Sequence, residues 1–145
     1  MGAPVRLGFL WLVNPKFIHG VAGVIVDDQG RVLLLKHRFW KGQRWGLPGG
    51  LAHPGETPAA TLRRKLLEET GLEVRPLKLL QVHTATSRLT KFILLAEASG
   101  EPTSRSKEIM DARYWDRSKL PDDLIPAHRQ LLDPSQDWPG IPLEE

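Results

Sequence analysis

Residues 50–72 read GLAHPGETPAATLRRKLLEETGL and contain the signals that begin and end a helix. Thr57 is a residue type that caps helix N-termini, and Pro58 suits the first helical position because its φ is already helical. Gly71 is the residue type that most often ends a helix, since it adopts a left-handed conformation without strain. These signals predict a helix over residues 57–70.

The predicted helix has an apolar face and a charged face. The apolar positions recur at spacings of three and four, and they are Ala59, Leu62, Leu66 and, at the edge, Leu67. Lys65, Glu68 and Glu69 share that spacing, so their side chains are expected on one face, opposite the apolar stripe. Two adjacent carboxylates suit Mg²⁺ or Mn²⁺, which prefer oxygen ligands. The alternative is a solvated face whose glutamates pair with neighbouring cations.

The segment before this helix predicts a hairpin. Residues 19–26 are nearly continuously apolar and rich in β-branched types, residues 27–30 supply turn chemistry, and residues 32–35 resume the apolar run. A buried helix broken at Gly30 is the alternative, which the β-branched residues disfavour.

Further strands and a shorter helix are predicted downstream. Residues 72–83 and 89–98 are predicted strands joined by a polar turn, 100–107 a loop, 112–115 a short strand and 126–132 a short helix that begins with proline. The proline-rich tail, 134–145, is predicted to lack regular structure, with Trp138 and Ile141 pinning it to the body. Because no linker or repeat divides the chain, residues 1–145 are predicted to form a single α/β domain.

Composition excludes several classes of protein. The chain has 145 residues, of which 41% are hydrophobic and 26% charged, and it has no cysteine. Disulfides, thiolate metal sites and cysteine nucleophiles are therefore excluded. No segment approaches the roughly 18 consecutive apolar residues that a membrane span needs. The net charge of +3 suits an anionic substrate, but the densest basic cluster is soon followed by two glutamates, so nucleic acid is not the expected partner.

The apolar run 7–13 has the composition of a signal-peptide core. Asn14, Pro15 and Lys16 follow it where small residues would mark a cleavage site. We therefore interpret the run as a strand or short helix of the mature protein, and we expect a cytoplasmic protein with no membrane partner. The same run and the tail are candidate surfaces for a homodimer.

The spacing of residues 50–72 resembles the signature of the Nudix hydrolases. That signature is glycine, five residues, glutamate, seven residues, Arg-Glu, an aliphatic residue, any residue, Glu-Glu, any residue, glycine and an aliphatic residue. The fixed residues that fall at these offsets are Gly50, Glu56, Arg64, Glu68, Glu69 and Gly71. One position departs, because Lys65 stands where the family has the glutamate of its Arg-Glu pair. Residues 45–50 resemble the family's lead-in Trp-x-Leu-Pro-Gly-Gly, and residues 108–115 resemble a segment common after its later strands.

The resemblance implies a fold, a reaction and a set of ligands. The fold would be an α/β/α sandwich with a mixed sheet, and the reaction would be metal-dependent cleavage of the diphosphate in a nucleotide or another small molecule. The residues that would hold Mg²⁺ or Mn²⁺ are Gly49, Glu68, Glu69 and Glu108. The three glutamates would be catalytic, with Glu108 acting as ligand or base, and a solvated loop glutamate is the alternative for Glu108. Glu56 and Arg64 would orient the carboxylates through a charge-assisted hydrogen bond, and a plain surface arginine is the alternative for Arg64.

Basic and aromatic residues elsewhere are candidates for substrate binding. They are Arg38, Trp40, Arg44, Trp45, His83 and Arg88. The arginines suit phosphate groups, and the tryptophans could stack on a nucleobase, although packing in the core or at its rim is an equal alternative. His83 could contact a phosphate or act as a base, and a structural histidine at a strand end is the alternative.

Lys65 leaves two functions open. A lysine ammonium has no acceptor, so it neither binds a metal ion nor accepts a proton from water, and it could occupy the place of an ion. Either the chain is a hydrolase that uses Glu68, Glu69 and Glu108 with fewer metal ions, which we favour because the other signature positions are intact, or it binds a nucleotide-like ligand without cleaving it. An engineered or inactivating substitution is a third explanation. Nucleoside triphosphates, nucleotide sugars, ADP-ribose and dinucleoside polyphosphates all stay open as substrates.

Overall fold

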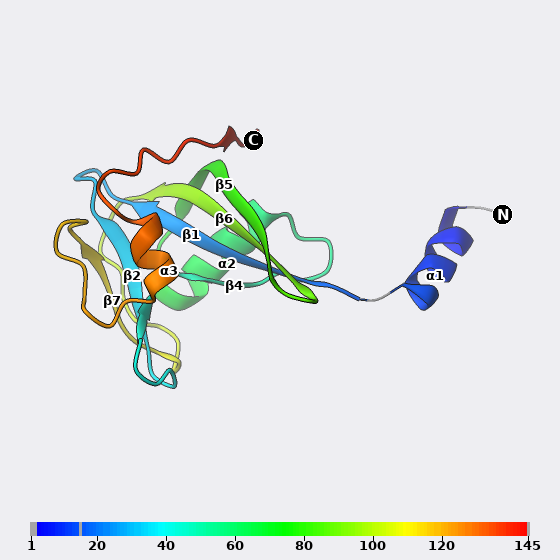
Figure 1. The fold of residues 1–145 in the computed structure, drawn as a ribbon, viewed down its shortest axis with the longest axis horizontal. Helices are drawn as coiled ribbons and strands as arrows, with labels where there is room; N and C mark the ends of the chain where they lie inside the picture. The colour runs from blue at the N-terminus through cyan, green and yellow to red at the C-terminus, as the bar shows by residue number, and fades with distance from the viewer. Residues whose placement is uncertain (1–2, 15, 145) are drawn as a thin grey trace.

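A mixed β-sheet forms the centre of the molecule. The computed structural model describes residues 3–14 and 16–144. In that part of the chain the strands are β1 (Ile18–Val26), β2 (Val32–His37), β3 (Trp45–Gly46), β4 (Gly49–Leu51), β5 (Val74–Thr86), β6 (Leu89–Ala98), β7 (Ile109–Trp115) and β8 (Ile141–Pro142). The helices are α1 (Ala3–Val13), α2 (Pro58–Thr70) and α3 (Pro126–Leu131). Figure 1 shows α2 and α3 on opposite sides of the sheet, which confirms the predicted α/β/α arrangement.

The sheet is mixed because β1 and β6 run parallel. The strand order is β3-β2-β1-β6-β5-β8, with β4 paired to β1 and β7 paired to β2. β1 pairs with β6 along its whole length and antiparallel with β2 and β4 on its other edge. The predicted hairpin is confirmed, since Val26 opposes Val32 across the turn. Asp27 holds that turn, because its carboxylate accepts from the backbone N–H groups of Gln29 and Arg31.

The signals at the ends of α2 act as predicted. The Thr57 hydroxyl accepts a hydrogen bond from the Ala60 N–H, and Pro58 occupies the first turn. Gly71 has a φ of 74°, and its N–H donates to the Leu67 carbonyl, which closes the helix. A left-handed residue at this point favours glycine because other residues place a Cβ against the backbone.

The burial of α2 corrects part of the sequence analysis. Leu62 and Leu66 are fully buried as predicted, but Leu67 is half exposed because it lies about 100° around the helix from Leu66. Glu69 is buried rather than opposite the apolar stripe. Positions 62, 66 and 69 are spaced by four and three residues, so Glu69 continues the buried stripe and Lys65 and Glu68 lie at its border.

Two hydrophobic clusters cover the two faces of the sheet. Alternate residues of β1 belong to different clusters: Val21 and Ile25 pack on the α2 side, whereas Ala22 and Val24 pack on the α3 side. Strand residues alternate between faces, so a β-branched strand such as β1 is buried on both sides. Gly23 allows α2 to approach closely, because a Cβ there would lie 2.8 Å from a Leu62 methyl group.

The observed bounds of β5, β7 and the tail differ from the predicted ones. β5 extends to Thr86 and β7 begins at Ile109, since both segments find antiparallel partners, in β6 and β2. The tail is less irregular than predicted, because β8 pairs with β5. Trp138 pins the tail by donating its ring N–H to the Leu131 carbonyl at 3.0 Å.

The apolar run 7–13 is helical, the second of the two predicted forms. It lies in α1, which stands clear of the sheet and its helices in Figure 1. Within the described residues, the structure contains no helix with the length and apolar character needed to cross a membrane.

Candidate functional site

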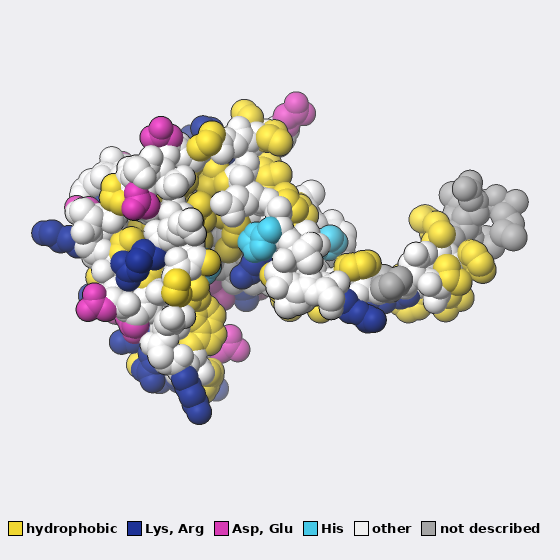
Figure 2. All heavy atoms as spheres, in the orientation of Figure 1, with side chains coloured by type: hydrophobic (Ala, Val, Ile, Leu, Met, Phe, Trp, Pro, Cys, Tyr) yellow, Lys and Arg dark blue, Asp and Glu magenta, His cyan; other side chains and the backbone are white. Residues whose placement is uncertain are grey.

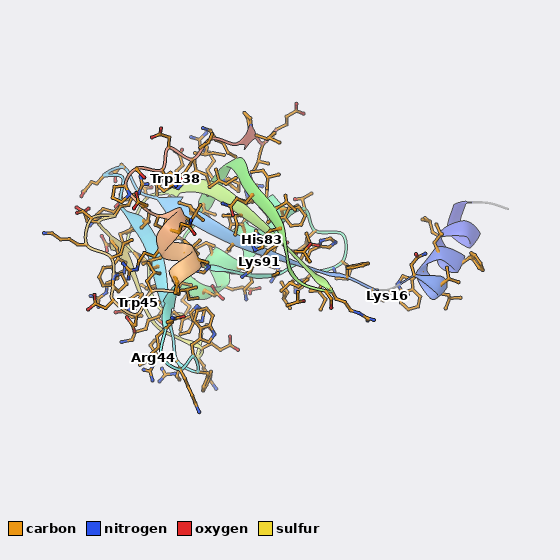
Figure 3. All side chains as sticks on the ribbon, in the orientation of Figure 1. Lys16, Arg44, Trp45, His83, Lys91 and Trp138 are labelled. Carbon is orange, nitrogen blue, oxygen red and sulfur yellow. The ribbon has the colours of Figure 1, made fainter. Side chains whose placement is uncertain are left out.

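A cleft of about 850 Å³ opens on the α3 side of the sheet. Its floor consists of two rows of residues paired across the strands. One row is Leu51, Gly20, Lys91 and His83, and the next is Gly49, Ala22, Ile93 and Gln81. The floor is hollow because Gly20, Ala22 and Gly49 carry little or no side chain. Figure 3 shows His83 and Lys91 close together on β5 and β6.

The predicted metal-binding helix meets this cleft at its glycine rim. Gly49 and Gly50 line the cleft, and the Lys65 side chain lies over Gly50, where a Cβ would come within 2.5 Å of the Lys65 Cε. Gly49 lies against β1, where a Cβ would meet the Val21 carbonyl oxygen at 2.0 Å. The two glycines therefore bring β1, β4 and α2 together at the edge of the cleft.

Glu56 and Arg64, which the resemblance implied would orient the carboxylates, are hydrogen-bonded to each other. Arg64 donates from Nε to one Glu56 oxygen at 2.7 Å and from Nη2 to the other at 2.9 Å, a bidentate arrangement. It also donates to the Leu51 carbonyl and to Glu68, so it joins β4 to α2. The Arg64 hydrogen bonds, followed by the His53 N–H, lower the pKa of Glu56 to about 2.

The Glu56 pair predicts an acid-dependent loss of stability. A carboxylate whose pKa is lowered by folding stabilises the native state above its ordinary pKa and loses that effect as it is protonated. For Glu56 the loss is expected between about pH 4.5 and about pH 2. Glu56→Gln should lower the free energy of unfolding at neutral pH, and the difference from the parent protein should shrink across that window.

Denaturant unfolding of both proteins over this pH range measures the effect. Glu73→Gln is the matched control, because Glu73 is an exposed glutamate close to the end of α2. A constant difference between Glu56→Gln and the parent at every pH would show that the ion pair is not the source of the stability.

Lys65 lies between the two carboxylates that the sequence analysis assigned to a metal ion. Its ammonium is 3.5 Å from a Glu68 oxygen and 3.4 Å from Glu69 Oε1. Partial burial opposes ionisation of Glu68, but Arg64 and Lys65 outweigh it and lower the pKa of this carboxyl. Burial raises the pKa of Glu69 despite the neighbouring Lys65 charge. The other Glu69 oxygen, Oε2, is buried and has no hydrogen-bond partner among the described residues.

The carboxylates of Glu68 and Glu69 have the chemistry that a divalent cation requires. A buried carboxylate oxygen without a partner is costly, and a cation is one group that would satisfy it. Glu68 is half exposed and accessible as a second ligand. Against this, among residues 3–14 and 16–144 no three acidic or histidine side chains converge on one point. Lys65 stands at the position where the resemblance implied a third carboxylate.

The loop that carries Glu108 lies beside this pair of glutamates. Glu108 is exposed; its charge adds to the burial that raises the pKa of Glu69, and it partly offsets the burial that lowers the pKa of His37. Arg38 fixes the loop, since its N–H donates to the Glu108 carbonyl and its Nε donates to the Lys107 carbonyl at 2.9 Å. Arg38 is therefore placed by its contacts as a loop anchor rather than in the lining of the cleft.

The predicted substrate-binding residues separate into two groups. Trp40 and His83 line the cleft, and Trp40 stacks on His37 with ring centroids 3.5 Å apart. Trp45 is 5% exposed and packs edge-on against Trp115, so the core alternative holds for it. Arg44 contacts the Met110 sulfur, and Arg88 lies at the exposed tip between β5 and β6, so neither lines the cleft.

The sequence analysis missed three titratable residues of the cleft: His37, His128 and Lys91. His128 accepts the Leu47 N–H at Nδ1, and burial, followed by the Lys91 and His37 charges, lowers its pKa to about 4. Burial lowers the pKa of His37 to about 4 as well. Both histidines are therefore neutral at physiological pH. Of these three residues, only Lys91 could have been singled out from the sequence, because it is a charged residue within an apolar strand.

Comparison with known proteins identifies the family. A helix with two signature glutamates beside a glycine rim, on a mixed sheet between helices, is the arrangement that the sequence resemblance implied. Residues 16–134 match the family model described as the NUDIX domain. The chain belongs to the Nudix hydrolase family.

Individual relatives agree with this assignment. The chain is 34% identical over 128 residues to the 8-oxo-dGDP phosphatase NUDT18 of Homo sapiens, a match that covers 84% of this chain and 38% of the human protein. It is 32% identical over 100 residues to the 8-oxo-dGTP diphosphatase of Proteus vulgaris, covering 65% of this chain and 89% of that protein. Among solved structures, the MutT NUDIX hydrolase from Burkholderia pseudomallei superposes with a TM-score of 0.68 at 28% identity, covering 81% of this chain and 97% of that chain.

Proposed function

We propose that this chain is a pyrophosphohydrolase that cleaves the diphosphate of a nucleoside diphosphate linked to another moiety, at a rate lowered by Lys65. The observation that carries the proposal is the buried Glu69 Oε2, which has no hydrogen-bond partner within the described part of the chain, on a helix that meets the glycine rim of the cleft. A buried carboxylate oxygen without a partner is suited to a ligand-dependent role, because a purely structural glutamate would have both oxygens satisfied.

A divalent cation would be held by Glu69 and Glu68, with the Gly49 carbonyl and Glu108 as further ligands. Mg²⁺ or Mn²⁺ at this point would neutralise charge on the diphosphate and make a water molecule more acidic. Arg64 keeps Glu68 in place through the 3.3 Å contact and keeps the β4 backbone in place through Leu51. Lys65 competes for the same carboxylates, but its ammonium is also suited to a phosphate oxygen at the rim.

The cleft would hold the organic part of the substrate. The small residues Gly20, Ala22 and Gly49 in its floor leave room for a flat ring, and Trp40 provides an aromatic surface at its side. His37 and His128 are neutral and Lys91 is the single cation among the described lining residues, so the cleft as a whole favours a neutral or anionic group. A purine or pyrimidine nucleotide satisfies these conditions.

A second function is favoured by one observation. Lys65 already contacts both Glu68 and Glu69, so the protein could retain a nucleotide in the cleft without a metal ion to activate water. In that case Lys65 would act as a permanent counterion for the diphosphate. The two functions differ in whether product forms.

A substrate panel tests the proposal. The probes are 8-oxo-dGDP, a nucleoside triphosphate, a nucleotide sugar and ADP-ribose, each with Mg²⁺ and with Mn²⁺. We expect release of a nucleoside monophosphate or phosphate that stops when the metal is removed by a chelator. The two relatives named above justify the first two probes, because their names concern 8-oxo-dGDP and 8-oxo-dGTP, and this chain spans 38% of the human one. Calorimetric binding of a probe with no product under either metal would overturn the proposal in favour of the binding function.

A further inference from the structure

α1 exposes an unusual amount of apolar surface. Six large apolar side chains of α1 are at least half exposed: Leu7, Phe9, Leu10, Trp11, Leu12 and Val13. The apolar surface continues through Phe17 and Ile18 at the start of β1, which are also more than half exposed. In Figure 2 the coloured part of α1 is largely apolar and stands apart from the body of the molecule. A continuous exposed patch of this kind marks an interaction surface.

The apolar side chains surround the helix instead of forming one stripe. At 100° per residue, the six positions leave no gap wider than about 100° around the axis. A groove on a protein contacts one side of a helix, so it would leave much of this surface in water. A helix that is apolar on all sides is usually immersed in an apolar phase.

The charge of the flanking sequence points to a particular apolar phase. Arg6 and Lys16 flank the apolar positions, and the first acidic residue of the chain is Asp27. The Lys16 ammonium lies 4.3 Å from the centre of the Trp11 ring, so a cation and an amphipathic aromatic ring stand together at one end of the helix. Tryptophan and lysine gather at the level of lipid headgroups, and a segment without acids is attracted to anionic lipids.

The length of α1 limits how it can meet a bilayer. Its 11 residues extend about 16 Å at 1.5 Å per residue, about half of the roughly 30 Å hydrocarbon core. We propose that α1 inserts into one leaflet of an anionic phospholipid membrane and so holds the Nudix domain at the membrane surface. This binding surface is separate from the cleft, and it departs from the expectation of no membrane partner.

Vesicle sedimentation tests the proposal with the full chain. The probes are phosphatidylcholine vesicles and phosphatidylcholine vesicles containing phosphatidylglycerol. We expect the protein to sediment with the anionic vesicles, and we expect the double variant Leu10→Glu, Trp11→Glu to partition about tenfold or more weakly, because two large apolar side chains no longer enter the lipid. Glutamate is a strong helix former, so α1 itself should persist. Lys16→Gln should weaken binding to the anionic vesicles less than the double variant does.

A matched control separates insertion from simple charge repulsion. Val82→Glu, Ile141→Glu adds the same two charges at exposed apolar positions on the body, and it should still sediment with the anionic vesicles. The proposal would be overturned if the α1 variant bound the anionic vesicles as strongly as the parent protein. It would also be overturned if both double variants lost vesicle binding to the same extent. Light scattering after gel filtration tests whether α1 instead contacts a second copy of the chain. If the parent protein is a dimer that does not bind vesicles, and the α1 variant is a monomer, α1 is a dimer contact and the membrane proposal is overturned.

Discussion

Lys65→Glu is expected to raise the affinity for Mg²⁺ and Mn²⁺ and to increase the rate of diphosphate cleavage by about 10²- to 10⁴-fold, the range typical of a gained general base. The substitution removes an ammonium that lies 3.4 and 3.5 Å from the carboxylates of Glu69 and Glu68. It adds a third carboxylate at the rim of the cleft, where the Lys65 side chain now covers Gly50. Metal titration by calorimetry and turnover of the best probe measure the two effects.

The metal-free Lys65→Glu variant is expected to be less stable than the parent. Three carboxylates without a cation repel one another, and a bound metal stabilises only the folded state. Thermal melts should therefore show a lower Tm without metal and a larger rise in Tm when Mg²⁺ or Mn²⁺ is added. This stability readout does not depend on finding a substrate.

Two further variants separate the effect of removing the ammonium from the effect of adding a carboxylate. Lys65→Gln removes the competing ammonium without adding a ligand, so it should recover part of the metal affinity but little of the rate. Arg63→Glu makes the same charge change at an exposed position of α2 and should change neither property by more than a small factor. If Lys65→Glu behaves like Arg63→Glu, residue 65 does not act at the metal site, or Glu108 already supplies the base.

Local signals in the sequence predicted the elements that depend on local physics. Thr57, Pro58 and Gly71 specify the ends of α2 through contacts within a few residues, so the helix could be predicted almost exactly. The hairpin between β1 and β2 follows for the same reason, since Asp27 closes its own turn. The Glu56–Arg64 pair, implied by the family signature, forms between positions eight residues apart.

The parts that escaped prediction depend on contacts between distant segments. The sequence analysis grouped Glu69 with Lys65, four residues before it, but Glu69 is also three residues after Leu66, and it is buried with that residue where α2 packs on the sheet. His37 and His128 are 91 positions apart in the sequence, and they share the cleft only because α3 folds over the sheet beside β2. Trp45 is a residue type that often binds ligands, but here it packs edge-on against Trp115 of β7.

Glu69→Gln is expected to lower Mn²⁺ affinity by about tenfold or more and to reduce turnover accordingly, while the free energy of unfolding at neutral pH stays equal or rises. The two effects have opposite signs because burial raises the pKa of Glu69, so folding the ionised carboxyl is unfavourable and a neutral amide removes that cost. A carboxyl group whose pKa is raised by folding contributes less to the free energy of unfolding as the pH rises, whereas Glu56 contributes less as the pH falls. Paramagnetic relaxation during Mn²⁺ titration and denaturant unfolding measure the two quantities, with Glu73→Gln as the control at an exposed site. Unchanged Mn²⁺ affinity in Glu69→Gln would reassign Glu69 to helix packing, and a large loss of stability would show that its contact with Lys65 outweighs the cost of burying its charge.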